Sequence, residues 1–250
     1  MNHNEYITTG FPTLDEAIGG FHPAELTIIG GRPAMGKSSM MISMVLNMAK
    51  HNKISSVVFS LEMPSEAMVR RMIKDMQNPY AEMPWLNLIY IDDTPSLSIT
   101  ALREKCLQLK NEENIQAVFI DYLQLLTLDD NAKNKPSETA RMEQLLKSLK
   151  AIAQELELPV IVFSQLNHSE DTGTKRPTLA NFMESASVVR QLADKILFIY
   201  RPEYYYVGDD NNDNSLKGYA EIIIAKCADC AVDSIALRFD KEIGKFYESF

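Results

Sequence analysis

Residues 26–39 read LTIIGGRPAMGKSS, a stretch that indicates a strand, a glycine-rich loop and a helix. Gly31, Gly36, Lys37 and Ser38 have the spacing of a phosphate-binding loop, G-x-x-x-x-G-K-S. Such a loop joins a strand to a helix, and its backbone N–H groups surround nucleotide phosphates at the positive end of the helix dipole. An apolar β-branched run at 26–29 precedes the loop and a helix-forming run at 40–49 follows it, which is the order that the motif requires. The alternative, a glycine-rich turn that binds nothing, is disfavoured by this context.

The composition predicts a single α/β domain over residues 1–250. Of the 250 residues, 46% are hydrophobic and 24% are charged, as in a globular protein. The chain has no apolar run of about 18 residues, no signal-peptide core and only three cysteines, so we expect a cytoplasmic protein with no membrane partner. The net charge of −9 is not typical of a nucleic-acid binder, although a local basic patch is compatible with it.

Short β-branched runs alternate with helical stretches along the chain. We expect strands at 26–29, 54–59, 88–91, 117–120, 160–163 and 196–200, and helices at 37–50, 66–76, 99–110, 138–156 and 179–192. Three last strands, at 221–225, 235–239 and 245–247, read as an antiparallel set. This alternation predicts a mostly parallel sheet covered on both faces, with an antiparallel C-terminal extension.

Three polar side chains follow the ends of expected strands, at the edge where an open α/β sheet binds its ligand. Asp121 stands where a second acid helps the loop hydroxyl to hold Mg²⁺, or else caps a turn. Glu62 fits either a carboxylate that orients attacking water or a charge at the start of the next helix. Gln165 stands where an amide can contact the terminal phosphate, although its position alone favours a surface glutamine.

Longer motifs resemble one family over nearly the whole chain. They run in family order as TGFPTLDEAIGGF (9–21), GRPAMGKSS (31–39), VFSLEM (58–63), IYIDDTP (89–95), FIDYLQLL (119–126), LPVIVFSQLN (158–167), KRPTL (175–179), ADKILFIYRPEYY (193–205) and AEIIIAK (220–226). The chain resembles the C-terminal ATPase domain of DnaB-type replicative DNA helicases. SLEM, DYLQLL and SQLN are far more specific than the phosphate-binding loop alone. The resemblance implies a RecA-like P-loop NTPase fold, a three-layer sandwich.

The resemblance also implies a site for ATP and Mg²⁺. Lys37 would neutralise phosphates, Ser38 and Asp121 would hold Mg²⁺, Glu62 would be the catalytic carboxylate, and Gln165 would sense the terminal phosphate. The nucleotide-binding residues that it implies are Gly31, Arg32, Pro33, Ala34, Met35, Gly36, Lys37, Ser38, Ser39 and Arg201.

Two departures from the family concern its ring of subunits. The sequence begins almost at the ATPase domain, so the family's N-terminal helical domain and linker helix are not in it. The segment after AEIIIAK keeps Lys226, for which the family implies a role in the neighbouring subunit's ATP site, but has Ala228 at the family's arginine position. A missing arginine of this kind predicts slow turnover unless another cation substitutes, because such a residue contributes roughly 10³–10⁵ in rate.

A further departure concerns single-stranded DNA. The family's DNA-contacting loop reads here Asn181-Phe182-Met183-Glu184-Ser185-Ala186, so Met183 removes a cation and Ala186 replaces a glycine. Lys175 and Arg176 are candidates to supply part of the charge, and Glu184 keeps its family position.

Cys227 and Cys230 form one C-x-x-C pair, with Cys106 far away in sequence. One pair does not make a zinc site. A redox pair is an alternative, but two small residues in a hairpin bend is the interpretation that the sequence favours.

Three hypotheses for function follow. The first is an ATP-dependent DNA helicase of replication, a homo-oligomer such as a hexamer that moves along single-stranded DNA. The second is a degenerate paralogue that binds ATP and modulates other proteins with little unwinding, which Met183, Ala186 and Ala228 favour. The third, a RecA-like ATPase of recombination or signalling, is disfavoured by the SLEM, DYLQLL and SQLN motifs.

Overall fold

The computed structural model describes residues 6–74, 83–129, 136–166, 176–205, 216–228, 230 and 233–248. In this part of the chain the strands form one nine-stranded sheet of order β3-β2-β4-β5-β1-β6-β7-β8-β9. The parallel strands are β1 (Leu26–Gly31), β2 (Ser56–Ser60), β3 (Ile89–Asp92), β4 (Ala117–Asp121), β5 (Val160–Gln165) and β6 (Lys195–Tyr200). The antiparallel strands β7 (Tyr219–Lys226), β8 (Ser234–Asp240) and β9 (Lys245–Glu248) extend the β6 edge. The predicted mostly parallel sheet with an antiparallel extension is confirmed.

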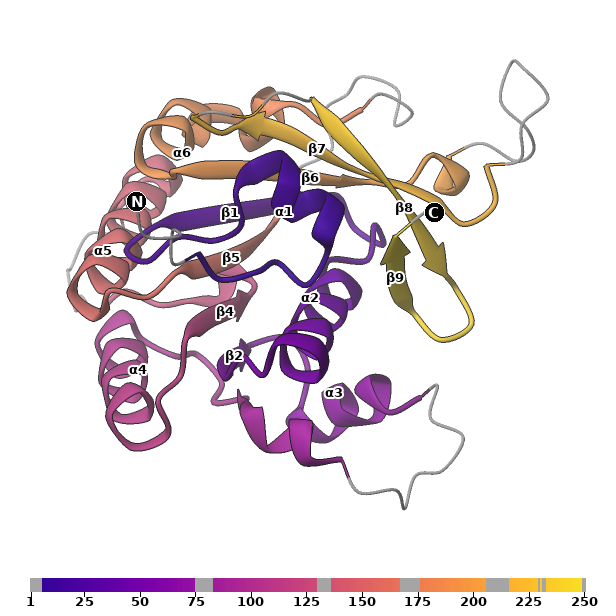
Figure 1. The fold of residues 1–250 in the computed structure, drawn as a ribbon. Coiled ribbons are helices and arrows are strands. Elements are labelled where there is room, and N and C mark those ends of the chain that lie inside the picture. Colours follow the sequence, from indigo (N-terminus) through magenta and orange to yellow (C-terminus); the bar gives the residue numbers. More distant parts are fainter. Residues whose placement is uncertain are drawn as a thin grey trace, which may run out of the picture.

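Helices cover both faces of the sheet, as Figure 1 shows. On one face lie α1 (Pro12–Ile18), α2 (Lys37–Asn47) and α3 (Ser65–Met72), and on the other lie α4 (Ile99–Glu113), α5 (Glu138–Leu156) and α6 (Ala186–Leu192). Short helical turns are η1 (Met48–Asn52), η2 (Pro84–Leu88), η3 (Leu123–Leu125), η4 (Leu179–Ser185) and η5 (Pro202–Tyr204). The arrangement is an αβα sandwich.

Two buried clusters hold these layers together because strand residues alternate between the faces. In β2, Val58 packs on the α2 side while Val57 and Phe59 pack on the α5 side. In β5, Phe163 and Val162 divide in the same way. Strands buried on both faces read as continuous apolar runs, which is why the parallel strands could be recognised from sequence.

Two helices differ from the expected ones. The helix expected over 179–192 is divided into η4, which ends at Ser185, and α6, which begins at Ala186. Inside η4, Met183 has non-helical angles, φ 53° and ψ −129°. Thr178 and Asn181 form a capping box that starts η4. The helix expected over 66–76 is α3, which ends at Met72.

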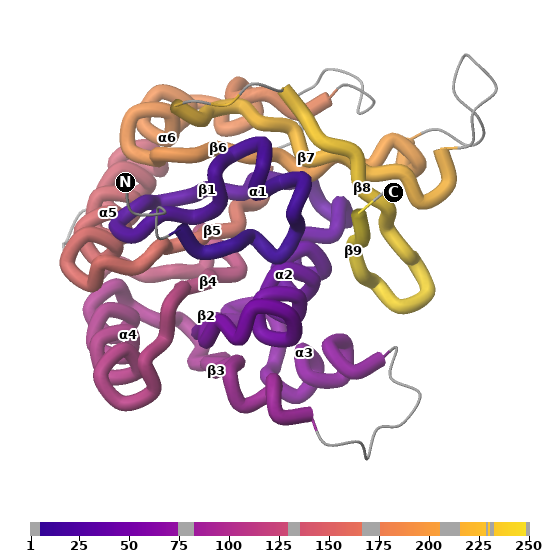
Figure 2. Tube along the Cα trace, viewed as in Figure 1, coloured from indigo at the N-terminus to yellow at the C-terminus, as the bar shows by residue number. Residues whose placement is uncertain are grey.

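Helix α1, early in the chain, lies beside the last strands of the sheet. Figure 2 shows the indigo N-terminal segment with α1 next to the yellow strands β8 and β9. Thr13 contributes to this seam, since its backbone N–H donates to Glu248 Oε1 at 2.6 Å and its hydroxyl donates to the same oxygen at 2.7 Å. Through these hydrogen bonds β9 of the antiparallel extension is attached to α1.

Candidate ATP site and the opposite edge of the sheet

The carboxyl ends of the parallel strands bring the predicted site residues together. In the strand register Gly31 lies beside Gln165 and Ser60 lies beside Asp121, all at one edge of the sheet. A cavity of about 540 Å³ opens there. Its lining includes Lys37, Ser38, Glu62, Arg71, Gln165 and Arg201. The structure therefore brings the ends of β1, β2, β4 and β5 together with the start of α2.

The loop between β1 and α2 has the backbone form of a phosphate-binding loop. Gly36 precedes α2 with φ 91°, a conformation that favours glycine, and a Cβ atom there would crowd Phe246 Cε2 at 3.1 Å. Ala34 also has a positive φ, of 63°. The Nζ of Lys37 donates to the carbonyl of Gly31 at 3.2 Å and lies 3.4 Å from that of Arg32. The lysine thus spans the loop that it belongs to.

Burial at this site disfavours the charged forms of Lys37 and Asp121. Burial lowers the pKa of Lys37, and the nearby carboxylates of Asp121 and Glu62 oppose that shift. Burial raises the pKa of Asp121; a hydrogen bond from Ser38 opposes the shift, and the charge of Glu62 adds to it. A bound phosphate would stabilise the charged form of Lys37, and a bound cation would stabilise the charged form of Asp121.

Ser38 and Asp121 fit a Mg²⁺ ion. Asp121 is 1% exposed, and its Oδ1 is buried without a hydrogen-bond partner among the described residues. Ser38 places a hydroxyl next to this carboxylate. A hydroxyl and a carboxylate oxygen are hard ligands of the kind that Mg²⁺ prefers, and a bound ion would satisfy the orphaned oxygen.

Arg71 is the charged residue of this cavity that was not predicted from the sequence. It lies in the last turn of α3, exposed, and lines the cavity together with Glu62 and Lys37. Burial raises the pKa of Asp121, and the positive charge of Arg71 opposes that rise. No ion pair joins Arg71 to the residues that the structure describes, whereas its neighbour Arg70 pairs with Glu66 at 3.5 Å. In the sequence, only its position after the SLEM motif pointed to Arg71, and an ordinary surface arginine could occupy the same position.

The remaining predicted nucleotide residues divide into two groups. Pro33, Ala34, Ser39 and Arg201 line the cavity. Gly31, Arg32 and Met35 are not among its lining residues, and Met35 is in the core at 1% exposed. Arg32 contacts Tyr205, with its Nη1 3.4 Å from the tyrosine hydroxyl, and the Arg201 guanidinium stacks 3.7 Å from the centre of the Phe239 ring.

Gln165 connects this cavity to a second one of about 390 Å³. The amide of Gln124 holds the strand end, accepting from the Gln165 backbone N–H at 3.2 Å and donating to its carbonyl at 3.0 Å. The second cavity is lined by η4, including Met183, which is 59% exposed, and Glu184. The strand end thus lies between the phosphate-binding loop and the segment predicted to contact DNA.

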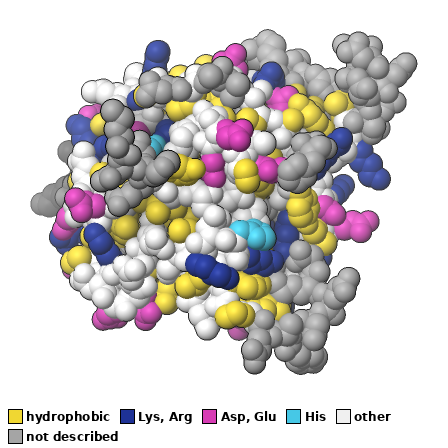
Figure 3. All heavy atoms as spheres, in the orientation of Figure 1, with side chains coloured by type: hydrophobic (Ala, Val, Ile, Leu, Met, Phe, Trp, Pro, Cys, Tyr) yellow, Lys and Arg dark blue, Asp and Glu magenta, His cyan; other side chains and the backbone are white. Residues whose placement is uncertain are grey.

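Of the other residues predicted to bind DNA, Arg176 forms an ion pair with Glu221 at 2.6 Å. Lys175 lies outside the described residues. On the face that Figure 3 shows, basic and acidic side chains are interspersed with apolar ones over the described part of the chain, and no extended basic patch appears there.

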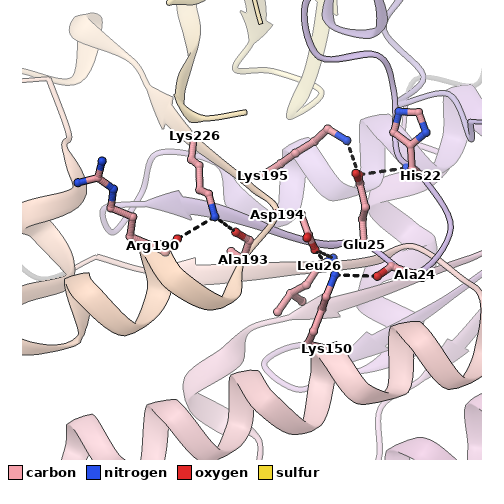
Figure 4. A network of polar contacts seen from close by, with 10 residues as sticks. All are labelled: His22, Ala24, Glu25, Leu26, Lys150, Arg190, Ala193, Asp194, Lys195 and Lys226. Carbon is pink, nitrogen blue, oxygen red and sulfur yellow. Dashed lines mark hydrogen bonds and ion pairs between the residues drawn. The ribbon is translucent and has the colours of Figure 1, made fainter. Parts of the chain in front are cut away.

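Lys226 lies at the opposite edge of the sheet, because it pairs with Ile196 at the start of β6. Its Nζ donates to the carbonyl of Arg190 at 2.8 Å and to that of Ala193, at the end of α6 (Figure 4). A cavity of about 660 Å³ lies beside it. Lys195, Lys226, Cys227 and Ala228 line this cavity.

The same edge carries a network of partly buried ion pairs. Figure 4 shows Lys195 reaching Glu25 and, separately, Lys150 reaching Asp194. The Lys150–Asp194 pair measures 2.6 Å, and Asp194 also accepts from the backbone N–H of Leu26 at 2.7 Å. These contacts fix the amino ends of β1 and β6.

Comparisons with known proteins identify the family of this chain. The family model described as "DnaB-like helicase C terminal domain" matches residues 6–83 and 76–248. The chain belongs to this family. The Replicative DNA helicase DnaB of Geobacillus stearothermophilus and the Replicative DNA helicase DnaC of Bacillus subtilis (strain 168) are each 36% identical over 261 residues. Each match covers 96% of this chain and 56% of the relative, so the chain spans little more than half of these proteins.

Two solved structures share the fold. A chain from "The Structure Of A DnaB-Like Replicative Helicase And Its Interactions With Primase" has a TM-score of 0.83 and 31% identity, over 100% of this chain and 65% of that one. A second solved structure, described as an "ATPase Domain", has a TM-score of 0.80 and 30% identity, over 98% of this chain and 91% of that one. The RecA-like P-loop sandwich expected from the resemblance is confirmed.

The cysteine pair of this DnaB-like domain corrects the sequence interpretation. Cys227 and Cys230 form a disulfide, with their Cα atoms 5.6 Å apart, rather than being two small residues in a bend. Cys106 is free and buried in the core. Sequence spacing raised the redox alternative but could not show that the hairpin brings the two sulfurs together.

Among the described residues, no helix combines the length and apolarity that crossing a bilayer requires.

Proposed function

We propose that this chain is the ATPase motor domain of a replicative DNA helicase, which hydrolyses ATP to move along single-stranded DNA. The observation that carries the proposal is one cavity at the carboxyl edge of the sheet that Lys37, Ser38 and Glu62 line, with the buried carboxylate of Asp121 hydrogen-bonded to Ser38 beside it. Family membership over nearly the whole chain supports it. In this proposal residues 1–250 act as one cytoplasmic domain.

The proposed chemistry is in-line attack of water on the terminal phosphate. Backbone N–H groups at the start of α2 and the ammonium of Lys37 bind the phosphates. Ser38 and Asp121 hold Mg²⁺, which neutralises charge on phosphate oxygens when it is bound. Glu62, exposed in the cavity, orients the attacking water and accepts its proton.

Two further side chains of the same cavity complete the proposed site. Arg71 is placed to neutralise charge that develops on the terminal phosphate, since it lines the cavity from α3 and already acts on Asp121. Gln165 contacts the terminal phosphate and, through Gln124 and the neighbouring cavity, links its loss to η4.

We further propose a homo-oligomer in which Lys226 serves the ATP site of the neighbouring subunit. Lys226 lies at the sheet edge opposite its own phosphate-binding loop, so within one copy it cannot reach that loop. A head-to-tail arrangement places these two edges against each other, and such contacts close into rings. A hexamer is the proposed ring.

The alternative, a degenerate paralogue, is favoured by positions that lack a free positive charge. Ala228 is exposed at the rim of the cavity that Lys226 lines and carries no charge. Arg176 is already paired with Glu221, and Met183 presents an apolar side chain in the predicted DNA segment. These features predict slow ATP turnover and weak binding of single-stranded DNA.

The deciding experiment measures the ATPase rate with and without single-stranded DNA, with the oligomeric mass determined on the same sample. If the protein is a multimer and single-stranded DNA raises its ATPase rate, the result supports the helicase motor. Nucleotide binding with slow turnover that DNA does not change supports the paralogue. A chain that binds no nucleotide contradicts both.

A further inference from the structure

We propose that Cys227 and Cys230 are a thiol–disulfide exchange site, which reacts with a low-molecular-weight thiol–disulfide couple. The site lies at the end of the β7–β8 hairpin, directly after Lys226. The redox reaction itself stands on the geometry of this hairpin. Its consequence for catalysis rests on the proposed function.

The hairpin is built so that the disulfide can open and close without breaking the sheet. The last strand pair is Ile223 with Ser234, and the backbone N–H of Ile224 donates to the carbonyl of Asp233 at 2.8 Å. Both cysteines lie beyond this closing hydrogen bond, in the connection between the strands. Their Cα separation of 5.6 Å lies within the range that an unstrained backbone gives a disulfide.

The pair is reachable by a small molecule. Both cysteines are half-buried, and Cys227 lines the cavity of about 660 Å³ beside Lys226. A volume of this size is typical of small-ligand sites. Groups of both signs line the cavity, including Glu16, Lys226 and the Lys195–Glu25 ion pair. Charges of both signs suit a zwitterionic peptide disulfide such as oxidised glutathione.

The third cysteine provides a contrast within the same chain. Cys106 is fully buried in α4, and burial raises the pKa of its thiol to about 12. Because the thiolate is the reactive form, Cys106 is inert toward exchange. Reactivity is therefore confined to the hairpin pair.

The exchange has a balanced course. The thiolate of one cysteine attacks a sulfur of the small disulfide, forms a mixed disulfide and releases one small thiolate. The thiolate of the other cysteine then attacks the protein sulfur of that mixed disulfide, closes the Cys227–Cys230 bond and releases the second small thiolate. The protein dithiol loses two electrons and two protons, and the small disulfide gains two electrons and becomes two thiols.

Closure constrains the backbone next to Lys226. The Nζ of Lys226 holds two carbonyls at the end of α6, and the disulfide fixes the chain that follows immediately. Ala228, which is exposed and lines the cavity, lies directly after Cys227, so the disulfide constrains its backbone as well. If the proposed function is right, oxidation sets the shape of the surface that faces a neighbouring ATP site.

The test is a redox titration of the full chain in glutathione buffers from fully reduced to fully oxidised. Samples are quenched in acid, free thiols are alkylated and intact masses are measured. We expect one two-electron transition in which two alkylation sites are lost together, with no adduct retained. Cys106→Ser should leave this transition unchanged. Cys227→Ser and Cys230→Ser should each stop at one glutathione adduct.

Three results would overturn the proposal: an unchanged number of alkylation sites at every buffer ratio, a stable glutathione adduct on the unaltered chain, or disulfide-linked dimers in place of the internal bond. Circular dichroism on each variant checks that it is folded. The titration needs no nucleotide, so its failure is distinct from failure of the proposed ATPase activity, which the turnover assay reports separately.

Discussion

We expect the protonation of Asp121 to depend on whether a metal ion is bound beside it. Its carboxylate is buried, its pKa is raised by that burial, and one oxygen has no partner among the described residues. The folded state therefore keeps the proton to a higher pH than the unfolded chain does. Stability falls as pH rises through the window between the two pKa values, and the full cost is present above that window.

This predicts opposite effects of Asp121→Asn with and without ligand. Without nucleotide at pH 8, the variant should melt higher by roughly 2–4 °C, which corresponds to about 1 kcal/mol in a chain of this length. That gain should vanish at acid pH, where Asp121 is protonated. With ATP and Mg²⁺ the order should reverse, because only the wild type holds the ion. Thermal melts at both pH values measure this, and a variant that is less stable without ligand at pH 8 contradicts the account.

Arg71 and Arg70 allow a matched comparison at adjacent positions of α3. Arg71 lines the ATP cavity, whereas Arg70 pairs with Glu66 at a highly exposed surface. Arg71→Ala should lower kcat for ATP by roughly 10²-fold, the usual effect of removing one group that stabilises transition-state charge. Arg70→Ala should leave kcat within about twofold, since exposed pairs contribute little. Equal effects of the two substitutions would remove Arg71 from the site.

At the scale of elements, β9 holds α3 in place. The Nζ of Lys245, 5% exposed, donates to the carbonyl of Met72 at the end of α3 at 2.9 Å. Lys245→Met should cost roughly 1–3 kcal/mol of unfolding free energy, because the buried carbonyl loses a charged donor. Lys241→Met, at an exposed position before β9, is the control and should be neutral. Urea unfolding compares them, and equal midpoints would show that this contact does not support α3.

Elements with a continuous apolar run could be predicted from sequence, and those shaped by tertiary contacts could not. The buried strands were recognisable because they pack on both faces. The break at Met183 could not be seen, since its left-handed φ interrupts a segment of ordinary helical composition. Helix α1 was missed although Pro12 and Gly19 mark its start and end.

The ATP site divides in the same way. Lys37, Glu62, Asp121 and Gln165 stand in motifs or at strand ends, and parallel strands bring such positions to one edge. Arg71 reaches the cavity only through the packing of α3, and Lys226 meets α6 across the sheet edge. Neither contact has a local sequence signal.

At the scale of the whole molecule, the two edges of the sheet predict complementation between subunits. Lys37→Ala removes the phosphate side of a site, and Lys226→Ala removes the side that we assign to the neighbour. Each variant alone should lack ATPase activity. An equal mixture should regain activity, since about a quarter of interfaces in a randomly mixed ring then carry both lysines. Continued inactivity of mixed oligomers, with exchange verified by mass, would place Lys226 outside the neighbour's site.

The proposed function depends first on the loop at residues 31–38, which we propose binds the phosphates of ATP. Calorimetric titration of ATP with Mg²⁺ into the wild type and into Lys37→Ala tests it most directly, with circular dichroism confirming that both are folded. The account predicts saturable binding to the wild type and loss of that binding in the variant. Equal affinity of the two proteins for ATP would contradict it.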